Sequence, residues 1–199
     1  KMGKDNPWRR CLEAINRLMY HHHPYKREVI GTEQVIASVT RETLMGYHRK
    51  WYAPDNMATI IAGDLDPQMA LADVARHFTF GPNRAGELPT FPAEPEQTEA
   101  RREALTGDVQ TGYVLAGFRG VPAMRLDEVI ALDAAMVVLG EGKSSRLYQR
   151  LVEQHPDTPF FDVGAAQWEY REAGMLIAYG VCRPDAVQTS ADLLLEQVS

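Results

Sequence analysis

A proline- and glutamate-rich stretch, residues 82–105, divides the sequence and limits the folds open to it. The stretch holds four prolines and five glutamates, and its apolar residues follow neither helical nor strand spacing. Proline lacks a backbone N–H and disfavours helix interiors and central strands, so we expect a linker here. The chain is therefore predicted to consist of a first part, residues 1–81, the linker, and a second part, residues 106–199.

Before the linker, the patterns are mainly helical. Asn6 followed by Pro7 is typical of a helix N-cap and first turn, and Thr40 and Asp66 are expected to begin two further helices. The β-prone run MATIIA, residues 57–62, predicts one short strand. The helix after Asp66 is expected to bury its apolar stripe: Leu71, Val74, Ala75 and Phe78.

After the linker, strand patterns dominate. Alternation over residues 111–120 predicts a strand, and residues 125–140 are apolar nearly all round, as in a buried helix. Ser145 is a plausible cap for the next helix. Two β-prone stretches, 160–168 and 174–182, are expected to form a hairpin.

With a last helix beginning near Asp185, strands cluster with helices but do not alternate strictly with them. This order favours an α+β fold, in which layered helices cover a largely antiparallel sheet.

Composition excludes several classes of protein. A net charge of −6 without a long Lys/Arg run argues against nucleic-acid binding, because phosphate neutralisation needs clustered cations. No apolar run approaches the ~20 residues that span a bilayer. Cys11 and Cys182 are too few for a disulfide framework.

Three consecutive histidines, residues 21–23, suggest a metal site or a purification tag. Adjacent residues point in different directions on a helix or strand, so three in a row cannot face one metal without an unusual loop. A tag is less consistent with their place between two patterned segments. We therefore interpret them as a polar helix end running into a proline loop, and His48, His77 and His155 as single surface or core residues.

The sequence GEGKSS, residues 140–145, has three interpretations. Its Gly, Lys and Ser resemble parts of a phosphate loop, but the glycine spacing of that motif and its preceding strand are missing. A tight turn between two helices is the simplest interpretation, and a loop that contacts peptide is the alternative. The acidic residues Asp162, Glu169 and Glu172 are interpreted as a solvated edge of the hairpin and not as a pair of catalytic carboxylates.

Several segments together resemble the pitrilysin/insulinase family of zinc metallopeptidases, which includes mitochondrial processing peptidase. They are HPY…VIGT, VTRETL…YAPDN and GDLDP within residues 23–67, and GEGKSSRLYQRLVE at 140–153, in the family's order and spacing. The resemblance implies two similar α+β domains of the processing-peptidase type. Residues 1–81 would then be the C-terminal half of the first, peptidase domain, and residues 106–199 the N-terminal part of the second, inactive domain.

The resemblance also implies that the catalytic zinc belongs to the parent protein. The family's His-x-x-Glu-His motif and its more distant glutamate ligand would precede Lys1, so no residue of this chain inherits a catalytic or a zinc-binding role. We expect the chain to be a fragment that binds no zinc and is inactive alone.

One departure from the family suggests which subunit this is. A substrate-holding arginine and tyrosine of the second domain are replaced here by Val152 and, near the tyrosine position, by a phenylalanine. Since two-subunit members divide zinc and this Arg/Tyr pair between chains, the sequence suggests the zinc-bearing chain of a two-subunit peptidase. The loop residues that would contact substrate are Gly140, Gly142, Ser144 and Ser145.

The expected partners are a peptide substrate and either a second family subunit or another copy of this chain, because sheet edges and helix faces of incomplete domains would be exposed. A non-catalytic structural or regulatory subunit of the same family is the alternative function. An unrelated peptide-binding module would require two family-like blocks to arise by coincidence. Resemblance to bacterial members favours an exported, periplasmic protein.

Overall fold

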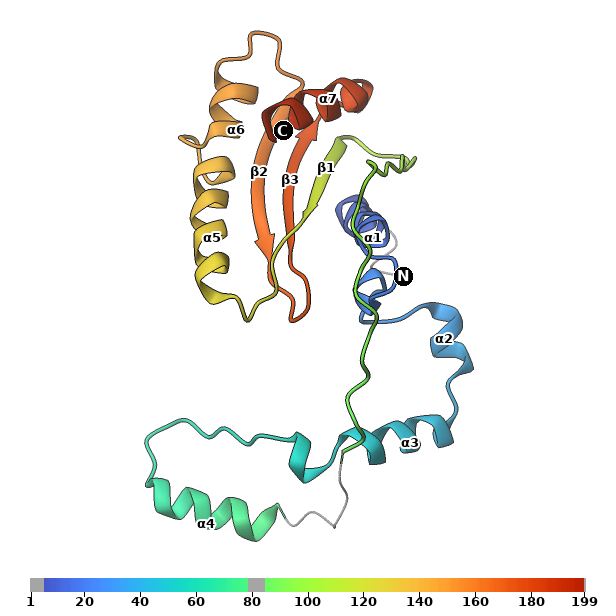
Figure 1. The fold of residues 1–199 in the computed structure, drawn as a ribbon, viewed down its shortest axis with the longest axis vertical. Coiled ribbons are helices and arrows are strands. Elements are labelled where there is room, and N and C mark those ends of the chain that lie inside the picture. The colour runs from blue at the N-terminus through green and yellow to red at the C-terminus, as the bar shows by residue number, and fades with distance from the viewer. Residues whose placement is uncertain (1–5, 79–84, 199) are drawn as a thin grey trace. The chain divides into compact units, whose positions relative to one another are not determined.

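The computed structural model describes residues 6–78 and 85–198 (Figure 1). The chain divides into two compact units, one formed by residues 1–28 with 92–199 and the other by residues 29–91. In the part of the chain that the structure describes, no helix is long and apolar enough to cross a membrane.

The larger unit is built on a three-stranded antiparallel sheet. Its strands are β1 (Gly112–Arg119), β2 (Phe160–Trp168) and β3 (Met175–Cys182), in the order β1-β3-β2. β2 and β3 form the predicted hairpin, with one register irregularity between Phe160 and Asp162. Since β3 is central, β1 and β2 are the two edges of the sheet.

Helices cover both faces of this sheet (Figure 1). On one face pack α5, α6, a π-helical turn and α7, whose bounds are Leu126–Gly140, Arg146–Tyr148, Gln149–Glu153 and Val187–Val198. The core on this face contains Val114, Leu147, Leu151, Phe160, Val163, Ala178, Cys182 and Leu194. Helix α1 (Pro7–Met19) packs on the opposite face, where the core contains Ile15, Met19, Tyr20, Met175 and Ile177.

The smaller unit contains α2 (Glu33–Ser38), α3 (Arg41–Trp51) and α4 (Pro67–His77). Of its described residues, 29–78 and 85–91, Ala53 alone is buried. This unit therefore has helices but almost no core of its own.

The predicted helix starts are confirmed by their caps. The side chain of Asn6 accepts a hydrogen bond from the backbone N–H of Arg9, and Thr40 and Asp66 cap α3 and α4 in the same way. The predicted strands of the larger unit are confirmed too, so the α+β class is correct. Helix α2, which begins after Thr32, was not expected, although Thr32 is an N-cap residue type and accepts from the N–H of Val35.

The strand predicted at residues 57–62 is wrong. This segment forms no helix or strand, and Ile60 and Ile61 are 89% and 51% exposed. A strand is stabilised by hydrogen bonds to a neighbouring strand, and the described residues of the smaller unit provide none.

Two predictions of burial are also wrong. Leu71 on α4 and Phe78 just after its end are 64% and 49% exposed, so the predicted apolar stripe does not line a core. On α5, Val137 and Val138 are 51% and 70% exposed, because the sheet covers only one side of this helix. Apolar pattern identified both helices correctly, but burial depends on what packs against them.

The stretch predicted as a linker contains no helix or strand over residues 85–105, and residues 82–84 lie outside the described part. Helix α1, predicted as part of the first segment, packs on the sheet formed by residues 112–182. The division into domains at 81 and 106 stays a prediction about the whole protein.

Candidate substrate-binding site

The turn between α5 and α6 places the four loop residues that the sequence predicts as substrate contacts. Gly140 and Ser145 are buried, whereas Gly142 and Ser144 are exposed. The Ser145 hydroxyl donates to the carbonyl oxygen of Gly142 at 2.7 Å and accepts from the N–H of Tyr148 at 3.4 Å. Ser145 therefore holds the turn closed, and Gly142 and Ser144 are the two that face solvent.

Two of these positions require glycine for different reasons. A Cβ on Gly140 would lie 2.0 Å from the backbone nitrogen of Ala165, so α5 approaches β2 too closely for any side chain. Gly142 has φ +72°, a left-handed conformation that favours glycine, in open space. Because a helix precedes the turn, a phosphate loop, which follows a strand, is excluded.

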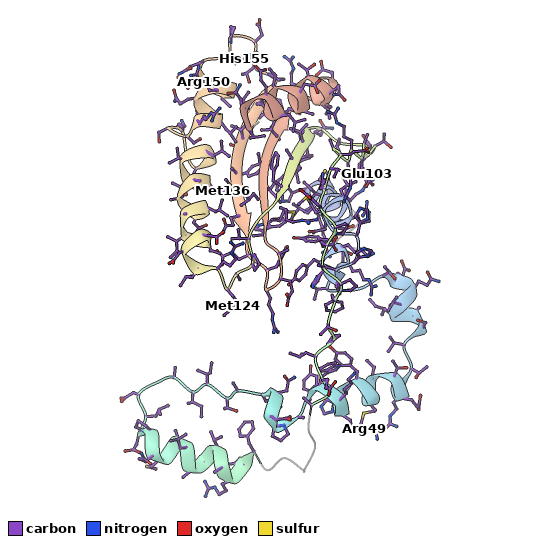
Figure 2. All side chains as sticks on the ribbon, viewed as in Figure 1. Arg49, Glu103, Met124, Met136, Arg150 and His155 are labelled. Carbon is purple, nitrogen blue, oxygen red and sulfur yellow. The ribbon has the colours of Figure 1, made fainter. Side chains whose placement is uncertain are left out.

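A groove of about 390 Å³ lies between α5 and the edge strand β2, next to this turn. Met136, labelled in Figure 2, lines it from α5. Its full lining is Asp133, Met136, Val137, Gly140, Glu141, Gly142, Asp162, Val163, Ala165, Ala166, Gln167 and Tyr179. The predicted loop residues Gly140 and Gly142 thus form one end of a larger concave surface.

Carboxylates give this groove its charge. Asp133 and Glu141 contribute from the α5 side and Asp162 from β2, and all three side chains are exposed. Burial of the Tyr179 phenol, together with the negative charge of Asp162, raises the pKa of Tyr179. The groove therefore offers hydrogen-bond acceptors and negative charge to a ligand, beside a strand edge that has no partner among the described residues.

Sequence reasoning placed Asp162 with Glu169 and Glu172 at one edge of the hairpin. The structure separates them: Asp162 lies opposite Val181 near the start of β2, and the two glutamates lie at the far end, in the connection between β2 and β3. The sequence did not identify Asp133, Gln167 and Tyr179 as part of a site. They lie on α5, β2 and β3, and only the packing of α5 against the sheet brings them together.

Val152 and Phe160, which the resemblance sets at the family's arginine position and near its tyrosine position, are apolar and at least partly buried. Val152 packs against the core under α6 and α7, and Phe160 is 4% exposed in the same core. Neither side chain offers a polar atom to a substrate.

The histidines 21–23 do not form a metal site. His21 and His22 are exposed, with ring centroids 6.3 Å apart, and the buried His23 accepts from the N–H of Tyr25 through Nδ1. Within residues 6–78 and 85–198, no group of three or more His, Cys, Asp or Glu side chains is arranged to hold a metal ion. The residues present do not fit a catalytic zinc, which takes at least three protein ligands.

Comparison with known proteins identifies the family. A family model described as "Peptidase M16 inactive domain" matches residues 38–199. An uncharacterised zinc protease of Mycobacterium tuberculosis is 28% identical, over 97% of this chain and 45% of its own length. Zinc protease PqqE of Helicobacter pylori is 33% identical, over 77% of this chain and 36% of its own length.

A solved structure, described as a protease from Helicobacter pylori, has the same fold. It aligns with a TM-score of 0.77 and 25% identity, covering 98% of this chain and 48% of that one. The chain thus spans about half the length of the proteins that it matches.

Proposed function

This chain belongs to the peptidase M16 family, and on that premise we propose that it is part of a zinc-dependent metalloendopeptidase in which it helps bind the peptide substrate. The zinc ligands and the general base would lie in polypeptide that precedes Lys1. The observation that supports this division is the lack of any metal-binding group among the described residues of a chain whose relatives are named zinc proteases.

We assign substrate contact to the exposed part of the α5–α6 turn and to the adjoining groove. The turn presents Gly142 and Ser144 to solvent, and the groove ends at the same turn, beside the open edge of β2. An extended peptide can add to such an edge through main-chain hydrogen bonds. Asp133, Glu141 and Asp162 would favour peptides that carry basic side chains.

The replacement of the Arg/Tyr pair supports a two-subunit enzyme. Because Phe160 is a core residue and Val152 packs against the same core, a second family member would have to supply the arginine and tyrosine that hold the substrate. In that arrangement this chain belongs to the zinc-bearing subunit, acting in an exported, periplasmic enzyme.

The experiment compares two polypeptides: the 199-residue chain and the whole protein that includes the preceding segment. Zinc content and hydrolysis of a fluorogenic peptide are measured for each, with and without the zinc chelator 1,10-phenanthroline. We expect zinc and chelator-sensitive turnover from the whole protein, with its partner subunit present, and neither from the 199 residues. Stoichiometric zinc or turnover in the 199-residue chain would contradict the proposal.

The description of the matching model as an inactive domain favours a second candidate, a non-catalytic structural or regulatory subunit. The same experiment separates the two. A whole protein that binds no zinc, yet raises the activity of a zinc-bearing partner, would support the non-catalytic subunit and exclude the catalytic one.

A further inference from the structure

The connecting segment of residues 92–111, which we call the strap, is bonded to α1 and to the turn that follows it. Arg17 of α1 forms an ion pair with Glu103 at 2.8 Å, and Figure 2 labels Glu103 on the strap beside α1. Further bonds join Arg10 to the Thr106 carbonyl oxygen, Arg101 to the Leu18 carbonyl oxygen, and Arg119 to the Pro95 carbonyl oxygen. A segment without helix or strand is thus held by side chains.

The most concentrated of these contacts is at Glu94. Its carboxylate accepts hydrogen bonds from three successive backbone N–H groups, those of His21 and His22 at 2.7 Å each and of His23 at 2.6 Å. Consecutive N–H groups that converge on one anion form a concave site for a carboxylate or phosphate. The histidines therefore bind through their backbone and not through their rings.

Local sequence explains why these three donors are available. Helix α1 ends at Met19, and the N–H of Tyr20 makes the last bond back into it, to the Asn16 carbonyl oxygen. Pro24 then begins a short 3-10 turn capped by His23. The N–H groups of residues 21–23 lie between two helical segments and donate to neither.

The pKa of Glu94 is consistent with an ionised carboxylate bound at this site. Burial acts to raise the pKa of Glu94, but the three N–H donors and the charge of His22 outweigh it, so that the pKa lies below its ordinary value. Tyr20, at the end of α1, is near enough to interact electrostatically with this carboxylate. Arg119 of β1 donates to the carbonyl oxygen of Pro95, next to Glu94 in the chain, and Lys26 donates to the carbonyl oxygen of His21 in the same turn. Hydrogen bonds to an ionised acceptor are roughly twice as strong as neutral ones.

The position of this contact gives it a structural consequence. The chain leaves the larger unit after Glu28 and returns to it at Pro92, and Glu94 follows the point of return directly. Arg9 forms an ion pair with Glu28 at 2.9 Å, and Glu28 follows the His21–His23 turn by a few residues in the sequence. The Glu94 contact therefore joins the outgoing connection of residues 29–91 to the returning one.

We propose that the backbone of His21–His23 is a carboxylate-binding site whose resident ligand is Glu94. This contact, which we call the latch, holds the segment just before Glu28, where the chain leaves the larger unit, to the segment just after Pro92, where it returns. Loss of the carboxylate charge opens the latch and frees the start of the strap. The chemistry of the site also allows a small carboxylate in solution to take the place of Glu94.

Hydrogen exchange of the 199-residue chain tests the latch. We expect Glu94→Gln, which keeps the shape and removes the charge, to speed exchange of the His21–His23 amides by at least about tenfold, with residues 92–100 also less protected. Protection in β2 and β3 should not change. The matched control is Glu96→Gln, an exposed glutamate two residues away, which should exchange as the wild type does.

A pH titration tests the direction in which pH changes the stability of the Glu94 contact. Because the folded pKa of Glu94 is lowered, the latch is fully present above the ordinary glutamate pKa of ~4.3 and is lost as the pH falls through the lower, folded value. The amide resonances of residues 21–23 should report that transition in the wild type and not in Glu94→Gln. Equal exchange in wild type and Glu94→Gln would overturn the latch.

Chemical rescue tests the binding site separately. In Glu94→Ala, acetate should restore the protection of the three amides, whereas chloride at the same ionic strength should not. If Glu94→Gln speeds exchange but acetate has no effect on Glu94→Ala, the latch stands and the site for external carboxylates is excluded. These outcomes do not depend on peptidase activity, so they are independent of the proposed function.

Discussion

At the scale of single residues, two adjacent serines in the α5–α6 turn have different environments. Ser145 is buried and bonded on both sides, to the carbonyl oxygen of Gly142 and the N–H of Tyr148, whereas Ser144 is exposed. The sequence motif marks both as candidate substrate contacts. Of the two, only the Ser145 side chain makes the hydrogen bonds that stabilise the turn.

We therefore expect the two alanine substitutions to separate stability from binding. Ser145→Ala should lower the free energy of unfolding by about 1–2 kcal/mol, because it removes the hydroxyl that caps α6 and donates to the Gly142 carbonyl oxygen, which then keeps only the backbone N–H of residue 145 as its donor. Ser144→Ala should leave stability within about 0.5 kcal/mol and raise KM for peptide in the whole protein. Urea unfolding and steady-state kinetics measure the two effects; equal unfolding midpoints for both variants would contradict the assignment.

Single residues also show how far the sequence can mislead. The three histidines attract attention as metal ligands, but in the structure their backbone N–H groups bind Glu94, which lies about seventy positions further along the chain. The end of α1 and Pro24 leave these N–H groups available, but no local pattern indicates that Glu94 is the residue that binds them. The contact depends on the tertiary structure, in which the strap lies beside the end of α1.

At the scale of elements, the close approach of α5 to β2 shapes the groove. It depends on Gly140, where even a methyl group would overlap the Ala165 backbone. The sequence predicts both elements and the turn after α5, yet it does not predict this contact, because a glycine at a helix end is equally typical of an ordinary C-terminal turn.

Gly140→Ala should destabilise the larger unit by about 1–3 kcal/mol or more, because the added methyl group forces α5 away from β2. The matched control is Gly46→Ala in α3, where, apart from the helix's own backbone and the two neighbouring residues, no atom of the described chain lies within 4 Å of the new Cβ, so the substitution should stabilise the helix by up to about 1 kcal/mol. Thermal unfolding and exchange in β2 measure the result. An unchanged melting temperature for Gly140→Ala would show that the two elements are not in tight contact.

At the scale of the whole molecule, exposed apolar surface is the main feature to explain. Large apolar side chains are exposed on the smaller unit and on the outer side of α5, among them Ile60, Leu71, Val137 and Val138. Isolated apolar residues on a surface are ordinary, but one buried residue among the described part of the smaller unit, 29–78 and 85–91, is too small a core to offset the conformational entropy of folding. Other polypeptide is expected to cover these surfaces in the functional protein.

For the 199-residue chain alone, we expect self-association. Residues 57–62 are β-prone, exposed and in no strand among the residues that the structure describes, so they can add to a strand of another copy. Ile60→Asp should lower the weight-average mass measured by light scattering at a given concentration. Thr59→Asp, which adds the same charge but removes no large apolar side chain, is the control and should lower it less. A wild-type mass that stays monomeric at all concentrations would contradict this expectation.

The sequence by itself determined the features that depend on neighbouring residues: the capped helix starts at Asn6, Thr40 and Asp66, the α5–α6 turn, and the β2–β3 hairpin. Caps, turns and periodicity depend on residues a few positions apart, so they can be predicted from the sequence without knowledge of the tertiary structure. The family could also be recognised, because its motifs are local.

Only the tertiary structure decided what depends on distant partners. It left residues 57–62 unpaired, exposed one side of α5, placed Asp162 with Asp133 in a groove, and set Glu94 on the backbone of the histidines. The physical reason is the same in each case: burial and strand pairing are properties of two surfaces, and a sequence pattern describes only one of them.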